Sequence, residues 1–181
     1  LRQLAARHPA LCSGAEGDGH MSALCFHQVP DAAAFAARMN RRLTPHGLRL
    51  MPLRFNEKRA LMYIYRPERL REDLDDPLAK EILGALGYPL ESGGRCIAKL
   101  AKRVRENKTF PHEIGLFLGY PIEDVVGFIR YAGKGCKLSG LWKVYGDAEA
   151  ASRLFDRLSR VCHAVTRRVD KGETLLEVFA A

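Results

Sequence analysis

The chain has 181 residues, of which 47% are hydrophobic and 28% charged, and its formal net charge is +8. This balance is typical of a globular protein, so we predict a single domain over residues 1–181 whose core needs neither disulfides nor a metal. No run of about 18 apolar residues occurs, which excludes a membrane-spanning helix. We see no apolar leader with a small-residue cleavage site, so we expect no secretory signal and a cytoplasmic location.

The cysteines and the basic residues narrow the range of partners. The five cysteines, Cys12, Cys25, Cys96, Cys136 and Cys162, are odd in number, and no two of them have CxxC spacing. We therefore expect reduced thiols rather than a disulfide framework or a zinc knuckle. The positive charge favours an anionic partner, such as nucleic acid, a phosphate-bearing ligand or an acidic protein, and it fits a role in solubility equally well.

The first third of the chain predicts a partly mobile segment, then strands and one helix. Residues 1–20 are expected to be partly mobile because the stretch 13–19 is rich in glycine. Asp31 is placed to cap the helix that follows it. The expected elements are a strand over 21–29, a helix over 32–43, and a hairpin of strands over 48–55 and 60–65.

The middle of the chain, residues 67–131, predicts a helical insertion. The most regular of its helices covers 95–106, where Ile97, Leu100 and Val104 recur at helical spacing. The other helices are expected over 67–74, 77–86, 112–118 and 121–130. Glycine, proline and tyrosine clusters separate them, as turn-forming residues do.

The last third predicts a strand over 141–145 and then a helix over 148–168 that is capped by Asp147. The helix carries an apolar stripe that includes Cys162, which we therefore interpret as a core residue. The order β-α-β-β-(helices)-β-α indicates the α+β class. We expect a small, mostly antiparallel sheet in a ferredoxin-like variant with a helical insertion, and helices packed on one of its faces.

Two long motifs carry a resemblance to a known family. They are FPHEIGLFLGYP at 110–121 and GLWKVYGD at 140–147, supported by residues 40–43 and 63–67. With them the chain is similar to a bacterial family, mainly from anaerobes, that is catalogued only as a domain of unknown function. The resemblance implies no established activity or catalytic residue. It implies a link to iron or redox physiology, because genes of this family lie near flavodoxin and ferrous-iron transport genes.

His112 and Glu113 are the most suggestive adjacent pair. We expect them to open a helix that is capped by Thr109 and has Pro111 in its first turn. A neutral histidine beside a carboxylate could transfer protons or bind a metal. The alternative is that Glu113 complements the helix dipole while His112 bonds to a loop. No further histidine or glutamate follows at the spacing of a zinc-protease motif.

The segment 114–125 has the spacing of a helix-turn-helix core. Its second helix offers Glu123, Asp124 and Gly127, whereas a recognition helix should offer arginine, lysine, asparagine or glutamine to the bases. We therefore interpret this segment as a packing unit and argue against nucleic-acid binding.

The lysine- and glycine-containing loop before residue 145 is the predicted ligand site. Trp142 and Val144 should face the core, while Lys143 and Tyr145 face the other way. Cys136, flanked by cations, could be a reactive thiol or a ligand of a soft metal or haem iron, and an ordinary exposed cysteine is the alternative. The candidate cofactor-binding residues are Lys134, Cys136, Lys137, Trp142 and Lys143. The candidate catalytic residues are His112, Glu113 and Tyr145, and the candidate metal ligands are His112, Glu113 and Cys136.

These observations support three hypotheses. The first is an accessory protein of iron or redox metabolism that binds a cofactor, a metal, an anionic small ligand or an acidic partner such as flavodoxin. The second is an enzyme that uses His112 and Glu113 for acid–base chemistry. The third is nucleic-acid binding through the helix-turn-helix-like segment. No motif identifies a particular cofactor.

Overall fold

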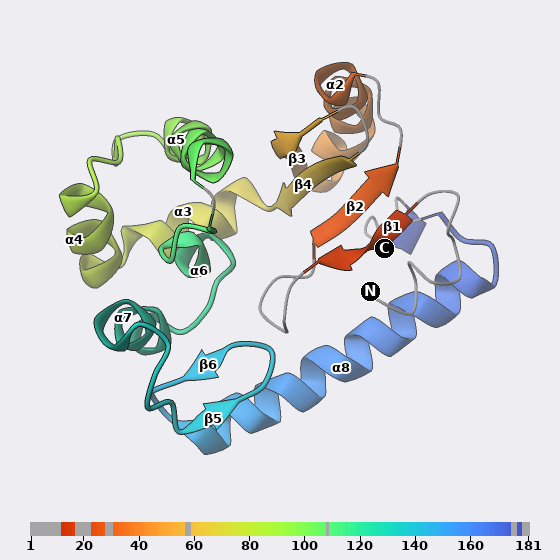
Figure 1. Cartoon of the computed structure of the whole chain (residues 1–181). Coiled ribbons are helices and arrows are strands. Elements are labelled where there is room, and N and C mark those ends of the chain that lie inside the picture. The colour runs from red at the N-terminus through yellow and green to blue at the C-terminus, as the bar shows by residue number, and fades with distance from the viewer. Residues whose placement is uncertain are drawn as a thin grey trace.

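A computed structural model describes residues 12–16, 23–27, 31–56, 59–107, 109–174 and 177–178. These residues form a four-stranded sheet, a group of short helices, and a separate two-stranded hairpin beside one long helix (Figure 1). Helices and antiparallel strands thus occupy separate parts of the molecule, as the predicted α+β class requires. Among the described residues, no helix is both long and apolar enough to cross a membrane.

The sheet has a split β-α-β arrangement. Its strands are β1 (Cys12–Glu16), β2 (Ala23–His27), β3 (Arg49–Phe55) and β4 (Arg59–Tyr65), in the order β1-β2-β4-β3. Strand β4 pairs antiparallel with both β2 and β3, so it lies between two strands that run in the same direction. Helix α2 (Ala32–Leu43) connects these two strands. Its N-terminus is capped as predicted, since the Asp31 carboxylate accepts hydrogen bonds from two backbone N–H groups.

The outer position beside β2 is filled by β1, where a ferredoxin-like plan would place the final strand of the chain. The final strand is instead β6 (Lys143–Val144), which pairs with β5 (Leu138–Ser139) in a separate hairpin. The prediction that residues 141–145 complete the main sheet is therefore wrong, because a turn at Gly140 gives that strand a local partner. The glycine-rich stretch 13–19, which was expected to be mobile, contributes residues 13–16 to strand β1. Residues 17–19 lie outside the described residues.

Helices cover both faces of the β3–β4 hairpin rather than the single face that was predicted. Leu50 and Met62 belong to a cluster with α2, whereas Leu53 and Tyr63 belong to a second cluster with the helical middle of the chain. Side chains alternate between the two faces of a strand. Because both alternating sets are apolar here, each face buries hydrophobic surface.

Five helices follow β4 and precede β5 in the sequence, and the third of them is the longest. They are α3 (Pro67–Asp75), α4 (Pro77–Ala85), α5 (Gly93–Glu106), α6 (Ile114–Phe117) and α7 (Ile122–Tyr131). The predicted apolar stripe of α5 is confirmed, since Ile97, Leu100 and Val104 are at most 1% exposed. Burying one such side chain stabilises the fold by roughly 1.5–3 kcal/mol.

Helix α6 is shorter than predicted and begins differently. Glu113 rather than Thr109 occupies its N-cap position, and no side-chain hydrogen bond caps it. The expected capping role of Thr109 is therefore wrong. The physical reason is that the chain around His112 forms a turn, which delays the first helical residue until Ile114.

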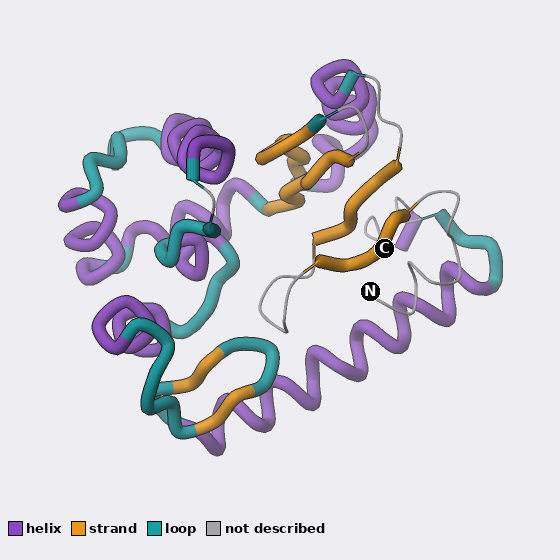
Figure 2. The backbone as a smooth tube through the Cα atoms, in the orientation of Figure 1, coloured by secondary structure: helices purple, strands orange, loops and turns teal. Residues whose placement is uncertain are grey.

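The long helix α8 (Ala148–Asp170) begins at its predicted cap, where the Asp147 carboxylate accepts two backbone hydrogen bonds. Its N-terminal half passes beside the β5–β6 hairpin (Figure 2). Ala151 of this half forms a core cluster with Trp142 and Val144 of the hairpin. In its C-terminal half Val161 is 53% exposed and Cys162 is also exposed. The interpretation of Cys162 as a core residue is therefore wrong, because the hairpin covers only the first part of the stripe.

Candidate functional site

His112 and Glu113 are adjacent in sequence, but their side chains have different surroundings. His112 is exposed, and its ring lies edge-on against the ring of Phe128 at 5.0 Å between centroids. Glu113 is only 3% exposed. Its Oε1 accepts a hydrogen bond from the Tyr88 hydroxyl at 2.9 Å and another from Nε of Arg103 at 2.5 Å. The carboxylate is thus occupied by partners on neighbouring elements.

The contacts of Glu113 have the character of a structural ion pair. Burial, followed by the charge of Glu113, raises the pKa of the Tyr88 hydroxyl, so Tyr88 stays a neutral hydrogen-bond donor. Arg103 neutralises the carboxylate and comes from the last turn of α5. Glu113 therefore fastens the start of α6 to α5 and to the segment after α4. The structure gives it no hydrogen bond to His112.

The lysines of the predicted ligand loop mostly bond to the loop itself. The Lys137 ammonium donates to the carbonyl oxygen of Gly146 at 2.8 Å, and the Lys143 ammonium donates to that of Gly133 at 2.5 Å. Lys134 is exposed. Two of the three predicted cations thus help to hold the loop closed against β6 and the turn that follows it.

Asp124 is the centre of this region, although the sequence indicated it only as a poor DNA contact. It is 3% exposed, and its carboxylate accepts hydrogen bonds from Trp142 Nε1 and from the backbone N–H groups of Tyr145 and Gly146, at 2.7, 2.7 and 2.8 Å. Trp142 is buried, as expected for a core residue. A single carboxylate on α7 therefore holds the β5–β6 hairpin in place.

The same contacts show that part of the helix-turn-helix-like segment packs against the rest of the protein. The face of α7 that carries Asp124 and Gly127 lies against Tyr145, where a Cβ on Gly127 would come within 2.3 Å of the tyrosine ring. Helices α6 and α7 meet where Gly115 faces Val125. These four residues of α6 and α7 are buried in contacts within the protein, whereas Glu123 of α7 is exposed.

Tyr145 and Cys136 lie near each other at the other side of the loop. The Tyr145 ring stacks on Tyr131 with centroids 5.7 Å apart, and no described residue bonds to its buried hydroxyl. Burial first, and then the nearby Cys136 and Asp124, raise the pKa of Tyr145. Cys136 itself is half-buried. Within the described part of the chain, no group of three histidine, cysteine or acidic side chains is arranged to hold a metal ion.

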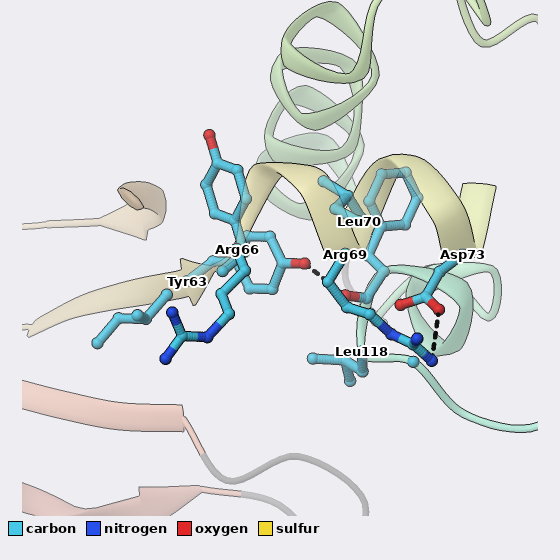
Figure 3. Close-up of a pocket in the computed structure, with 10 residues that line it drawn as sticks. Tyr63, Arg66, Arg69, Leu70, Asp73 and Leu118 are labelled. Atoms are coloured by element: carbon cyan, nitrogen blue, oxygen red, sulfur yellow. Dashed lines mark hydrogen bonds and ion pairs between the residues drawn. The ribbon is translucent and has the colours of Figure 1, made fainter. Parts of the chain in front are cut away.

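A groove that the sequence did not indicate lies where β4 ends and α3 begins (Figure 3). Its volume is about 350 Å³, and it is open to solvent on one side. Its wall comes from the end of β4, from one face of α3, and from the turn after α6. The lining residues are Tyr63, Ile64, Tyr65, Arg66, Arg69, Leu70, Asp73, Phe117, Leu118 and Gly119.

The local sequence explains how the groove is built. Arg66 is the N-cap residue of α3, and Arg69, Leu70 and Asp73 lie three, four and seven residues after it, which places all four on one side of the helix. Figure 3 shows the two arginine side chains leaving α3 on the side of Leu118.

Two contacts fix the opposite wall. The buried Tyr63 hydroxyl donates a hydrogen bond to the carbonyl oxygen of Phe117 and so ties the end of α6 to β4. Burial raises the pKa of this hydroxyl, which keeps it protonated as a donor. Gly119 then turns the chain with φ of 68°, a left-handed conformation that suits glycine. The turn brings Gly119 close to Asp73.

The groove carries a positive charge that is only partly compensated. Arg69 forms ion pairs with Glu72 at 3.4 Å and with Asp73 at 3.2 Å. Arg66 donates to the carbonyl oxygen of His46 at 3.1 Å, and no carboxylate of the described residues forms an ion pair with it. Arg49 pairs across the strands with Tyr65, which lines the groove. The guanidinium of Arg66 is therefore available to an anion.

Sequence reasoning missed this groove because its two walls are far apart in the chain. The segment 63–67 carries the family resemblance and joins a predicted strand to a predicted helix, and the spacing of Arg66, Arg69 and Asp73 on that helix was the available signal. Nothing local in the sequence shows that the turn at 117–119 closes the other side.

Comparison of the sequence with known proteins identifies the family of this chain but not its function. A family model described as "Protein of unknown function (DUF3793)" matches residues 18–179. No curated protein and no solved structure matches the chain. The resemblance inferred from the motifs is thus confirmed at the level of the family, and the chain belongs to the DUF3793 family of proteins of unknown function.

Proposed function

We propose that this protein binds a small anionic ligand in the groove between α3 and the end of α6, and that it serves as a binding or accessory protein. The observation that carries the proposal is Arg66, which lines a concave site and whose guanidinium forms no ion pair with a carboxylate of the described residues. Small-ligand sites are concave, mostly apolar, and contain a few polar groups that fix orientation.

The electrostatics of the groove support an anion over a cation. Arg66 and Arg69 bring two positive charges, and Asp73 brings one negative charge that already faces Arg69. Guanidinium groups bind carboxylate and phosphate with paired hydrogen bonds, which are stronger than bonds between neutral groups. One net positive charge remains, and a ligand with one acidic group would neutralise it.

A binding role fits the described residues better than an acid–base enzyme. Glu113 is engaged with Tyr88 and Arg103, whereas His112 contacts Phe128 on another side. The two side chains that the enzyme hypothesis requires to act together therefore contact different partners. The family resemblance supports the wider proposal that the ligand belongs to iron or redox metabolism, and binding of an acidic protein such as flavodoxin remains part of that proposal.

The first test is a titration of ¹⁵N-labelled protein with inorganic phosphate at low salt, followed by NMR. We expect shifts concentrated at Arg66–Leu70 and at Phe117–Gly119. Arg66→Gln should weaken binding by about tenfold or more, because a hydrogen bond to a charged group contributes roughly 1.5–3 kcal/mol.

The matched control is Arg71→Gln, which removes an equal charge from an exposed position of the same helix outside the groove. It should leave phosphate binding nearly unchanged. Equal weakening by both variants would show a general charge effect and contradict the proposal. Shifts confined to other regions, or no shifts at low salt, would contradict it as well.

A further inference from the structure

We infer that the acidic group bound in the groove is carried by an extended segment of a partner protein, which pairs as an additional strand with the open edge of β4. This inference rests on the proposed function and names the class of partner that the same groove would take. Its support is the position of the groove along the edge of the strand, together with the unpaired backbone groups of Ile64 and two nearby arginines.

The groove runs along the edge of β4 rather than over one face of the sheet. Tyr63 and Tyr65 pack with the cluster of the helical middle, whereas Ile64 packs against the cluster that contains α2. These three side chains therefore point to opposite faces of the sheet, yet all three residues line the groove, and Arg66 does so too. Strand β3 occupies one edge of this part of β4, so the groove lies at the other edge.

The backbone of Ile64 presents hydrogen-bonding groups at this edge. Ile64 pairs with Leu50 of β3. The Leu50 N–H donates to the side-chain oxygen of Asn40 at 2.7 Å, and its carbonyl oxygen accepts from the Asn40 amide at 2.9 Å, so Leu50 directs both groups away from β4. In an antiparallel ladder both residues of such a pair turn their N–H and C=O away from each other. Those of Ile64 therefore point to the side of β2.

Strand β2 does not extend far enough to pair with Ile64. It pairs with Arg59, Ala60 and Leu61 of β4, and no described residue forms a hydrogen bond with the backbone N–H or C=O of Ile64. Unpaired groups at a strand edge are a template for another strand, and extended peptides are commonly recognised in this way. A helical segment would leave the Ile64 groups without partners, because its own backbone groups bond internally.

The charges at the end of β4 favour an acidic residue in the added strand. Arg66 and Arg69 line the groove, and Figure 3 shows both on the side of Leu118. A strand added in line with β2 runs antiparallel to β4 and so begins opposite the end of β4, where Arg66 lies. Residues that pair across strands share a face, and faces alternate along a strand. The segment should therefore carry an acidic residue opposite Arg66 and, two residues later, an apolar residue opposite Ile64.

The test uses the blocked peptide acetyl-Glu-Thr-Val-Thr-amide, whose glutamate and valine would lie opposite Arg66 and Ile64. Titrated into ¹⁵N-labelled protein, it should shift the resonance of the Ile64 N–H and slow its exchange with water. A peptide with N-methylated valine keeps every side chain but lacks the N–H that would donate to the Ile64 carbonyl oxygen, so it should bind about tenfold more weakly. Replacing the glutamate by glutamine should weaken binding about tenfold as well, because the charge that Arg66 binds is lost.

The same peptides separate the inference from the function on which it rests. Arg66→Gln should abolish the preference for glutamate over glutamine and keep the effect of N-methylation, whereas the control Arg71→Gln should keep both. Equal affinity of the parent and N-methylated peptides, or phosphate binding without peptide binding, would overturn the added strand and leave the anion site standing. Absence of binding by peptide and phosphate would overturn both. Slow exchange of the Ile64 N–H in the free protein would show that the edge is already paired and would overturn the inference.

Discussion

The lysine loop before β6 and the groove beside α3 both bring basic residues together with tyrosines, but they use the charges differently. In the loop, Lys137 and Lys143 donate to carbonyl oxygens of the same region. In the groove, Arg66 also donates to one carbonyl oxygen, that of His46, but this contact uses only one of the several N–H groups of an exposed guanidinium beside a concavity. The contrast teaches that a cationic motif indicates a ligand site only if some of its donors remain free after the protein's own contacts are made.

Asp124→Ala tests whether the lysine loop and its hairpin are held by the protein's own contacts, and it has the largest expected effect. The change removes the acceptor of three hydrogen bonds at a site that is 3% exposed. We expect the free energy of unfolding to fall by about 3–5 kcal/mol, because buried donors lose a charged partner. Urea denaturation measures this loss.

The control for Asp124→Ala is Glu123→Gln, which alters an exposed neighbour on the same helix. It should change the free energy of unfolding by less than about 0.5 kcal/mol. A similar small loss in Asp124→Ala would mean that the hairpin does not depend on this carboxylate, and the loop could then be mobile enough to bind a ligand.

Glu113→Gln tests whether the most suggestive residue of the sequence is structural. The variant keeps the size of the side chain but leaves Arg103 without its ion-pair partner. Since Arg103 is 30% exposed, water offsets part of the loss, and we expect about 2–3 kcal/mol of destabilisation. Phosphate binding in the groove, measured on the folded protein, should not change. Loss of binding with normal stability would show that Glu113 belongs to a ligand site.

The part of the fold that local sequence determines was predicted well. Asp31 caps α2, and the apolar stripe of α5 is buried, because capping and periodicity act within a few residues. Strand β1 was missed because its sequence CSGAE contains small and polar residues without an alternating apolar pattern. Its pairing with β2 comes from backbone hydrogen bonds, which any residue but proline can make.

The candidate site was harder to predict for a related reason. Whether a charged side chain is free depends on contacts between segments that are distant in the chain. Glu113 meets Tyr88, which lies 25 residues away, and Tyr63 meets Phe117 at a separation of 54 residues. The sequence shows the charge of each residue but not its partner, so the loop was favoured and the groove was overlooked.

Gly119→Ala tests the turn that closes the groove. At φ of 68° an added Cβ is strained, and it would also lie 3.4 Å from an oxygen of Asp73. We expect destabilisation of about 1–2 kcal/mol together with weaker phosphate binding, because the turn must shift. The matched control is Gly93→Ala, at a position where an added Cβ meets nothing within 4 Å. Equal stability and binding of the two variants would show that the turn does not shape the groove.

The smallest expected effect concerns Asp73, which lines the groove and lies near the charges of Arg69 and Glu72. Burial raises the pKa of this carboxyl above its ordinary value of 3.8, and the opposing charge of Arg69 only partly lowers it. A folded-state pKa above the unfolded value means that stability is fully present below pH 3.8 and declines as the pH rises through the folded-state value. Asp73→Asn should therefore be more stable than the unmodified protein at pH 7 by a few tenths of a kcal/mol, on the order of a small pKa shift.

The same titration should appear in anion binding. When Asp73 is ionised it competes with the ligand for Arg69, so Asp73→Asn should bind sulfate about two- to threefold more tightly at pH 7, as a partly exposed ion pair of about 0.5 kcal/mol implies. Sulfate serves as the probe because its charge stays constant in this range. The two proteins should become alike as the pH falls below the pKa of Asp73. If Asp73→Asn still binds sulfate more tightly than the unmodified protein at low pH, the asparagine acts through its shape rather than its lack of charge. The charge of Asp73 would then not contribute to the difference between the groove and the loop.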